Sequence, residues 1–254
     1  MALQIVVPMA GAGQRFKDAG YTTPKPLISI AGVPMVVRAI NELPDAGRVI
    51  FLVLESHIRE HQIDQVLSSL IPTCSIVVVD GVTAGQACTV RLAQAELNEE
   101  WPVIVAACDN SHLYDSSQLE LMMQDASVEC LVWTYRGEPR TAIRPRQYGW
   151  VQVDGCRVRR VSCKSPISQT PVDDHVVSGF FFFRSAGRMM HYIDKMVAAD
   201  MRVNGEFYMD IVPNVMVADG HDVRVFEVEK YIGWGTPEEL AEFQKWERYC
   251  ARLR

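Results

Sequence analysis

Short apolar segments alternate with amphipathic segments along the first half of the chain. Residues 3–9 form an apolar run that leads directly into Gly11 and Gly13, which is typical of a buried strand ending in a tight loop. Further strands are expected at residues 48–54, 74–79 and 101–108, and helices at residues 34–43, 58–70 and 86–97. This alternation predicts a doubly wound α/β fold with a parallel sheet.

Beyond residue 127 the pattern becomes richer in strands. Strands are expected at residues 129–135, 149–153, 157–163 and 176–183, and helices near residues 188–197 and 207–217. These segments should extend the same sheet. No Gly/Ser-rich or Pro-rich linker divides the chain, although residues 136–146 read as a flexible basic loop. The sequence therefore predicts one domain over residues 1–254.

The composition is that of an ordinary globular protein, with 48% hydrophobic and 22% charged residues. A net charge of -6 argues against a general nucleic-acid binder, because phosphate backbones attract clustered Lys and Arg. The seven cysteines form no CxxC pair and are odd in number, so we expect reduced thiols in the cytoplasm. Neither a signal peptide nor an apolar run of the ~20 residues that span a bilayer is expected, so no membrane contact is predicted.

A glycine-rich loop after the first strand is followed by two basic residues. Residues 8–28 read PMAGAGQRFKDAGYTTPKPLI, with the basic groups at Arg15 and Lys25. Glycines let backbone N–H groups approach an anion, Arg15 supplies a planar fork of donors, and Lys25 supplies a mobile charge. The motif is neither a P-loop nor a full G-x-G-x-x-G, which argues against a P-loop ATPase and a dehydrogenase. A purely steric glycine turn and solvated surface charges remain the alternatives.

This stretch resembles the signature of the sugar-phosphate nucleotidyltransferase family, G-x-G-x-R followed by P-K-P/A-L. The family includes bacterial choline-phosphate cytidylyltransferases, and the resemblance implies a Rossmann-like mixed, mostly parallel sheet flanked by helices. It implies a nucleotide-binding half at about residues 1–126 and an acceptor-binding half at about 127–254. In this reading Arg15 binds the departing pyrophosphate, and Lys25 binds the α-phosphate and the attacking phosphate. Nucleotide contacts are expected from Met9, Ala10, Gly11, Ala12 and Gly13.

Asp109 follows the apolar segment at residues 103–108, at the carboxyl end of an expected strand. Open α/β sheets bind ligands at this edge, and Mg²⁺ prefers carboxylate oxygens together with substrate phosphates. The family resemblance also carries a metal-binding aspartate onto this position. The alternative is an aspartate that only caps the next helix.

The family's second metal ligand is an Asp or Asn just before a G-T-P-E-D-L-like segment. Residues 231–240 read YIGWGTPEEL, so Gly233 and Trp234 stand where the acid is expected. Asp210 is the substitute that we test first, with Glu206 behind it. Both can instead be solvent-facing helix residues.

Recognition of the base and of the acceptor is expected from three further segments. Gly85 and Gln86 begin an expected helix where the family touches the nucleobase. The family's acceptor-binding lysine corresponds to Lys164, but Cys163 replaces the glutamate before it, which puts recognition of sugar hydroxyls in question. A basic cluster can add anion contacts or form a solvated surface; it consists of Arg140, Arg144 and Arg146. The six histidines show no metal-ligand spacing.

These features predict an Mg²⁺-dependent nucleotidyltransferase. Its partners are a nucleoside triphosphate (CTP, UTP, GTP or dTTP) and a phosphorylated small molecule, a sugar 1-phosphate or a non-sugar phosphate with CTP as donor. Pyrophosphate is the second product, and surface glycan biosynthesis is the expected role, with homo-oligomers possible. A metal-dependent glycosyltransferase that uses a nucleotide sugar is the first alternative. An inactive nucleotide-binding module is the second.

Overall fold

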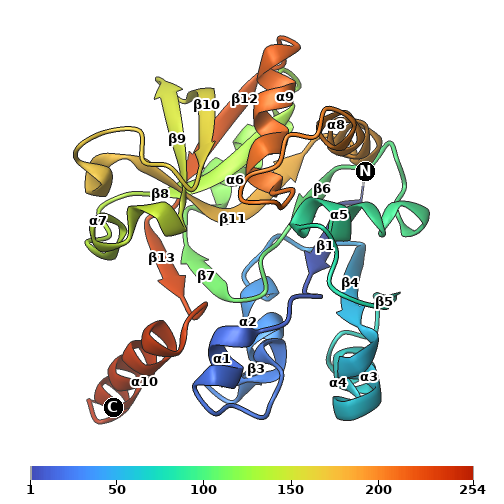
Figure 1. Ribbon diagram of the computed structural model, residues 1–254, viewed down its shortest axis with the longest axis vertical. Coiled ribbons are helices and arrows are strands. Elements are labelled where there is room, and N and C mark those ends of the chain that lie inside the picture. The colour runs from blue at the N-terminus through green and yellow to red at the C-terminus, as the bar shows by residue number, and fades with distance from the viewer. Residues whose placement is uncertain (1, 254) are drawn as a thin grey trace.

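A nine-stranded mixed β-sheet runs through the computed structural model of the chain, which describes residues 2–253 (Figure 1). Its strands are β1 (Gln4–Pro8), β4 (Arg48–Leu54), β5 (Cys74–Val79), β6 (Val103–Val105), β8 (Cys130–Tyr135), β9 (Gly149–Asp154), β10 (Arg157–Cys163), β11 (His175–Phe183) and β12 (Val223–Glu227). In space they follow the order β5, β4, β1, β6, β11, β8, β12, β10 and β9. Two short antiparallel pairs lie outside this sheet: β2 (Ser29–Ile30) with β3 (Val33–Pro34), and β7 (Asn110–Leu113) with β13 (Lys230–Gly233).

The first half of the chain builds the parallel part of the sheet. β1 pairs in parallel with β4 and β6, and β4 pairs in parallel with β5. β4 is buried at all but its first position, since a parallel strand is covered on both faces. In the second half, β11 runs antiparallel to β6 and β8, and β9 and β10 form an antiparallel pair. The expected mixed sheet is confirmed, with its parallel pairs in the first half apart from the pair of β8 and β12.

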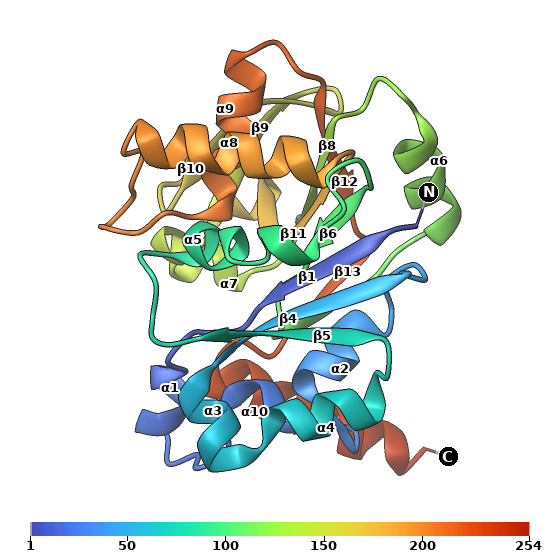
Figure 2. The same cartoon turned by 90° about the vertical axis from the view of Figure 1, so that its right-hand side faces the viewer.

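Ten α-helices flank the sheet within residues 2–253. They are α1 (Gln14–Asp18), α2 (Met35–Ile40), α3 (Glu55–His61), α4 (Ile63–Leu70), α5 (Gln86–Arg91), α6 (Ser116–Gln124), α7 (Arg140–Ile143), α8 (Ala186–Ala198), α9 (Val212–Ala218) and α10 (Pro237–Ala251). Figure 2 shows α5, α8 and α9 on one face of the sheet and α2, α3 and α4 on the other.

Each face of the sheet carries its own hydrophobic cluster, because successive strand residues point to opposite sides. In β1, Val6 belongs to the cluster beneath α5, α8 and α9, whereas Ile5 and Val7 belong to the cluster beneath α2, α4 and α6. The alternation fixes the sheet as the middle layer of three. The carboxyl edge of β1 is thereby held in a rigid position.

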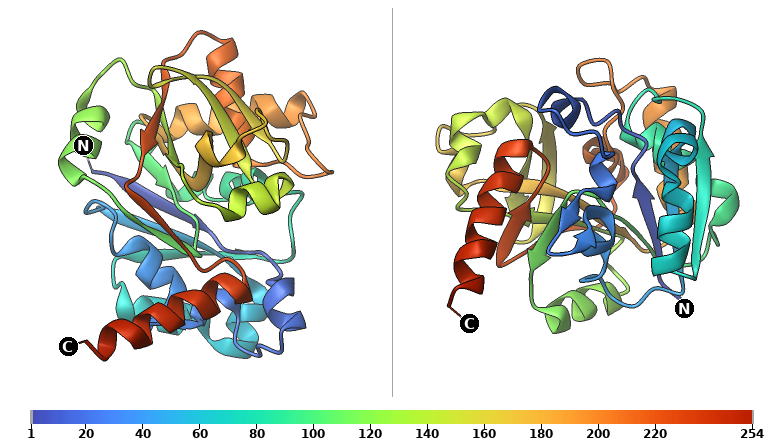
Figure 3. Two further views of the ribbon diagram at one scale, coloured as in Figure 1. Left: turned by 90° about the vertical axis from the view of Figure 1, so that its left-hand side faces the viewer. Right: turned by 90° about the horizontal axis from the view of Figure 1, so that it is seen from below.

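A third cluster joins the beginning of the chain to its end. Phe16 and Ile28 pack there with Trp234 and Leu240, and all four side chains are buried. The pair of β7 and β13 carries the chain back from the second half, so α10 lies beside α1 and α2 (Figure 3). Residues 233–239 are therefore brought next to the glycine-rich loop.

Several expected helices are shorter than the sequence pattern predicts. The helix expected at 58–70 is two helices, because Gln62 adopts a left-handed conformation with φ of 51°. The helix expected at 207–217 begins as a 3₁₀ turn, Met209–Ile211, and α9 follows it. The basic loop expected at 136–146 is wrong in part, since α7 and the 3₁₀ turn Pro145–Gln147 lie within it. Local hydrogen bonds decide these boundaries, and hydrophobic periodicity does not report them.

β7, α6, β12 and β13 are among the elements that the sequence-based expectations do not include. β7 and β13 are short and lie outside the main sheet, which is why their pattern is weak. Within residues 2–253, no helix combines the length and the apolar character that a membrane crossing needs. All seven cysteines are free thiols.

Candidate active site

The glycine-rich loop follows β1 at the carboxyl edge of the sheet and ends at Gly13. Gly13 adopts φ of 64° and ψ of 26°, a left-handed conformation that glycine enters without steric cost, and it begins α1. Its carbonyl oxygen accepts hydrogen bonds from the N–H groups of Phe16 and Lys17. Because Phe16 is buried in the third cluster, the short helix that carries Arg15 is anchored.

A cavity of about 450 Å³ opens directly above this loop. One wall consists of the loop itself with Arg15 and Lys25, and the opposite wall consists of Thr83, Gln86 and the second-half residue Glu206. The phosphate-binding candidates and the base-binding candidates thus line one cavity. Its size and its two different walls suit a nucleotide.

Gly85 is the point at which the two halves of the chain meet beside this cavity. It adopts φ of 134°, and a Cβ at this position would overlap the backbone of Phe207. Two backbone hydrogen bonds fasten the contact: Phe207 N–H donates to Ala84 O at 2.9 Å, and Ala87 N–H donates to Phe207 O at 3.0 Å. Only glycine fits at this position, so the close packing against Phe207 is by itself a structural reason for a glycine at position 85.

Lys25 and Asp109 form an ion pair on the rim of the cavity, with the Lys25 Nζ donating to the Asp109 Oδ2. Their side chains are 20% and 24% exposed. Burial by itself lowers the pKa of Lys25, but the charge and hydrogen bond of Asp109, together with Cys108, outweigh it and leave that pKa raised. Lys25 is therefore cationic at neutral pH.

Asn110 holds the segment that carries Asp109 in place. Its side chain is 2% exposed, and its Nδ2 donates to Ser178 O at 3.0 Å. The same Nδ2 lies 3.4 Å from Asp109 Oδ1. On the other side, the Trp234 N–H donates to Asp109 O at 2.8 Å. The carboxylate is thus positioned by both β7 and the segment that leads into α10.

Gly235 is the residue that faces Asp109. A Cβ on Gly235 would lie 2.9 Å from Asp109 Oδ2 and 3.5 Å from Glu239 Oε2. The sequence analysis places the missing acid at Gly233 and Trp234, and a Cβ on Gly233 would lie 3.3 Å from Glu239 Cδ. Gly233 pairs with Asn110 in the β7–β13 ladder, and a Cβ there would lie 2.8 Å from the Tyr231 ring.

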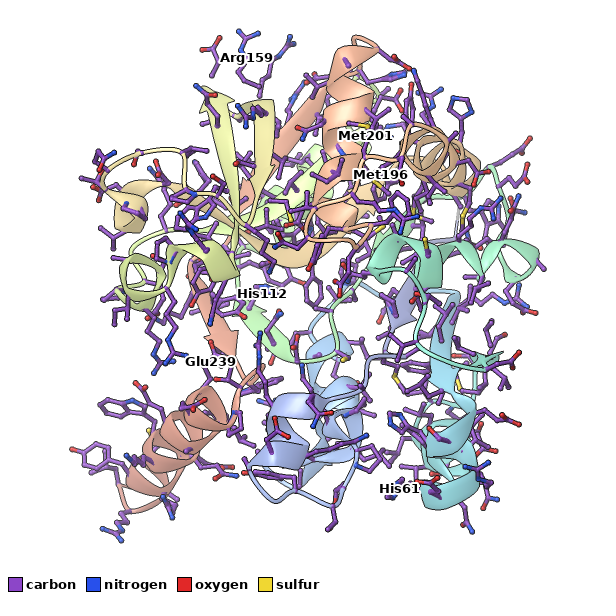
Figure 4. The ribbon with its side chains drawn as sticks, viewed as in Figure 1. His61, His112, Arg159, Met196, Met201 and Glu239 are labelled. Atoms are coloured by element: carbon purple, nitrogen blue, oxygen red, sulfur yellow. The ribbon has the colours of Figure 1, made fainter. Side chains whose placement is uncertain are left out.

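Glu239 is a site residue that the sequence analysis missed. Figure 4 labels it where β13 leads into α10. Its Oε2 accepts the Thr236 N–H at 3.0 Å, and the Thr236 hydroxyl accepts the Glu239 N–H, which together form a capping box. Burial raises the pKa of Glu239, and the nearby charge of Asp109 raises it further. The T-x-x-E pattern could have predicted the helix start, but not the proximity to Asp109.

Three other expected site residues lie apart from the cavity. Met9 is 3% exposed and sits in the hydrophobic core, so its side chain does not line the cavity. Lys164 donates from its Nζ to Gln147 O at 2.6 Å. Asp210 is packed against Gly149 of β9, and burial raises its pKa. Asp210 does not line the cavity, because the 3₁₀ turn that carries it faces β9 and β10.

An α/β sheet with a glycine loop at the end of its first strand defines a nucleotide-binding class of protein. Residues 5–191 match the MobA-like NTP transferase domain, and the chain belongs to this family. It is a nucleotidyltransferase. The expected fold class and the resemblance to this kind of enzyme are confirmed.

Solved structures of nucleotidyltransferases share the fold. A nucleoside-diphosphate-sugar pyrophosphorylase from Vibrio cholerae RC9 has a TM-score of 0.75 at 20% identity, over 95% of this chain and 99% of the other. The inositol-1-phosphate CTP transferase from T. maritima has a TM-score of 0.73 at 15% identity, over 95% and 93%. HddC from Yersinia pseudotuberculosis has a TM-score of 0.67 at 17% identity, over 97% and 100%. A comparison with curated proteins finds no match.

Proposed function

We propose that this enzyme transfers a nucleoside monophosphate from a nucleoside triphosphate to a small phosphorylated metabolite and releases pyrophosphate. The observation that supports this most directly is the Lys25–Asp109 ion pair on the rim of the cavity that Gly11, Gly13 and Arg15 line. A cation and a carboxylate there meet the two needs of phosphoryl transfer: charge neutralisation and metal binding.

The proposed reaction is an in-line displacement at the α-phosphorus. An oxygen of the acceptor phosphate forms the new P–O bond, while the bond from the α-phosphorus to the bridging oxygen breaks and its electron pair leaves with pyrophosphate. Because a phosphate dianion is already charged, no protein nucleophile or general base is required. Lys25 holds the α-phosphate and the incoming phosphate together, and Arg15 binds the departing pyrophosphate.

NTP transferases of this family generally depend on a divalent metal, and the residues at Asp109 fit one. The Asp109 carboxylate faces Gly235, whose Cβ would lie 2.9 Å from Oδ2, so residue 235 leaves open space beside a carboxylate whose charged neighbour is Lys25. We propose that Mg²⁺ binds there with Asp109 and triphosphate oxygens, the ligand set that this ion prefers. Bound Mg²⁺ would neutralise charge on the triphosphate. Asp210 has less support as its second ligand, since it packs against β9.

The two functional halves of the chain also belong to this proposal. Residues 1–126 carry most of the nucleotide cavity, and residues 127–254 carry the acceptor side with Lys164. Glu206 and Gly235 are exceptions to this division, because they belong to the second half of the chain but line the nucleotide cavity. The donor is CTP, UTP, GTP or dTTP, and the acceptor is a sugar 1-phosphate or a non-sugar phosphate. We propose a cytoplasmic role in surface glycan biosynthesis, which the seven free thiols fit.

A pyrophosphate-release screen tests this function. Each of the four triphosphates is combined with phosphorylated sugars, alcohols and amino acids in the presence of Mg²⁺, and product is identified by mass spectrometry. Release that depends on both substrates supports the proposal. Release of a free nucleotide from a nucleotide sugar would identify a glycosyltransferase instead. Nucleotide binding by calorimetry without turnover on any pair would identify an inactive binding module.

A further inference from the structure

Two carboxylates approach one point beside the nucleotide cavity. The position that a Cβ of Gly235 would take lies 2.9 Å from Asp109 Oδ2 and 3.5 Å from Glu239 Oε2. Asp109 reaches this point from the position directly before β7, and Glu239 reaches it from the first turn of α10. Residues 130 positions apart in sequence are thus brought to the same spot, because the third cluster fixes α10 beside the glycine loop.

The glycine at position 235 makes this approach possible. Contacts under 3.0 Å are essentially never seen for a real Cβ, so any side chain there would push Asp109 out of its position. Gly235 also lines the nucleotide cavity together with Lys25. The space that a side chain would fill is therefore next to the nucleotide cavity and is bordered by Asp109 and Glu239.

Glu239 has binding capacity that its own helix does not use. Its Oε2 accepts one hydrogen bond, from the Thr236 N–H at 3.0 Å, and within residues 2–253 it forms no ion pair. The nearby cations have other partners: Lys25 pairs with Asp109, Arg140 pairs with Glu242, and Lys230 lies 3.7 Å from Glu138. Two carboxylates at one point repel each other, and a cation placed between them removes that repulsion.

We infer that Glu239 acts with Asp109 as the second carboxylate of the divalent-cation site, in place of the acid expected at Gly233 and Trp234. The inference rests on the proposed function and adds a residue to it. Since Mg²⁺ usually keeps several waters, Glu239 acts directly or through one of these waters. The capping box holds the Glu239 carboxylate in one orientation, which suits a ligand better than a mobile surface acid.

The test measures Mn²⁺ binding by electron paramagnetic resonance, because Mn²⁺ accepts the same oxygen ligands as Mg²⁺. Glu239→Gln keeps the capping box, since glutamine serves at this position as well, but removes the charge. We expect the Kd for Mn²⁺ to rise about tenfold to a hundredfold. Glu238→Gln is the matched control: it removes the same charge from an exposed neighbour and should leave the Kd for Mn²⁺ unchanged.

A second variant separates the carboxylate from the helix start. Thr236→Ala breaks one capping contact but keeps the charge of Glu239, so we expect a lower melting temperature with near-normal Mn²⁺ affinity. An unchanged Mn²⁺ affinity in Glu239→Gln would overturn the inference, and so would a loss in Thr236→Ala as large as in Glu239→Gln. Either result leaves the proposed function intact if the wild-type enzyme binds Mn²⁺ and releases pyrophosphate. A wild-type enzyme that does neither overturns both.

Discussion

At the proposed nucleotide end of the site, the charged groups gather around one cavity, whereas in the second half of the chain Lys164 and Asp210 lie apart from it. Arg15, Lys25 and Asp109 lie on or beside a single cavity, and the positive charge of Lys25 faces its rim. Lys164 and Asp210 are already engaged with their own neighbours, Gln147 O and the β9 residue Gly149. The proposed nucleotide end is thus preorganised for an anion, while the proposed acceptor end satisfies its polar groups internally.

From this difference we expect that removal of the Lys25 charge lowers kcat more than removal of any other charge of the site. Lys25→Ala should lower kcat by about 10²–10³-fold at saturating substrates, because it removes a positive charge positioned at the reacting phosphates. Nucleotide affinity should change much less. Pyrophosphate release under steady-state conditions gives kcat, and calorimetry gives the Kd for the nucleotide.

The control for this variant is Lys17→Ala, which removes an exposed lysine of the same helix–loop segment that does not line the cavity. It should keep normal kinetics. A near-normal kcat in Lys25→Ala would contradict the proposed role of Lys25 at the reacting phosphates and would remove the main contrast between the two ends.

The junction between the two halves should be the next most sensitive point. Gly85→Ala places a Cβ on the backbone of Phe207 and forces alanine into φ of 134°, so we expect a loss of about 2–3 kcal/mol in the free energy of unfolding. Urea unfolding measures this loss. Gly81→Ala, where a Cβ meets nothing within 4 Å, is the comparison and should cost far less.

At the acceptor end we expect a smaller effect on one substrate only. Lys164→Ala should raise the KM for the acceptor about tenfold and leave the KM for the triphosphate unchanged. The effect is modest because the Lys164 Nζ, which lies 2.6 Å from Gln147 O, has to exchange that hydrogen bond for one to the acceptor. A fall in kcat as large as that of Lys25→Ala would show that both ends are organised alike. Initial-rate kinetics with each substrate varied in turn decide between these outcomes.

The smallest predicted effect is a pH dependence of stability behind the nucleotide end. His112 of β7 is 5% exposed against Trp133 and Phe180, and burial lowers its pKa from 6.5 to about 3. Below pH 6.5 His112 therefore binds a proton in the unfolded chain but stays neutral in the folded protein. The free energy of unfolding thus falls as the pH falls from 6.5 toward 3. Between pH 7 and pH 6 the expected loss from this group is about 0.7 kcal/mol.

His112→Leu removes the titrating ring and should flatten this slope, measured as the urea midpoint at each pH. His191→Leu, at an exposed position of α8, should keep the wild-type slope. An identical slope in His112→Leu and in the wild-type protein would show that His112 does not carry the effect.

The same contrast explains how far sequence alone could predict the molecule. The buried strands of the first half and the glycine loop depend on local patterns, so β1, β4 and β5 fall close to where the apolar runs predict them. The place of Asp109 at the edge of the sheet could be predicted because this residue follows an apolar segment. The break at Gln62 depends on a single left-handed residue, which no hydrophobic period reports.

The remaining site features depend on contacts between distant segments. Sequence spacing points to Gly233 as the position of the missing acid, whereas the structure shows that Gly235 is the glycine that faces Asp109 and that Gly233 faces Tyr231 and Glu239. Glu239 reaches the same point only because Phe16 and Leu240 pack in one cluster. Such proximity is set by tertiary packing, which a single sequence does not display.

The cluster that joins Phe16 to Trp234 and Leu240 also has a consequence for how the enzyme matures during translation. Residues 1–126 leave the ribosome long before residues 234–240 are synthesised, and domains tend to fold progressively from the N-terminus. Until the later segment emerges, the Phe16 ring has only the early part of its packing, from Tyr21 and from Ile28 of the same cluster. The cavity above the glycine-rich loop is thus complete only after Glu206 and Gly235, which help to line it, have been synthesised.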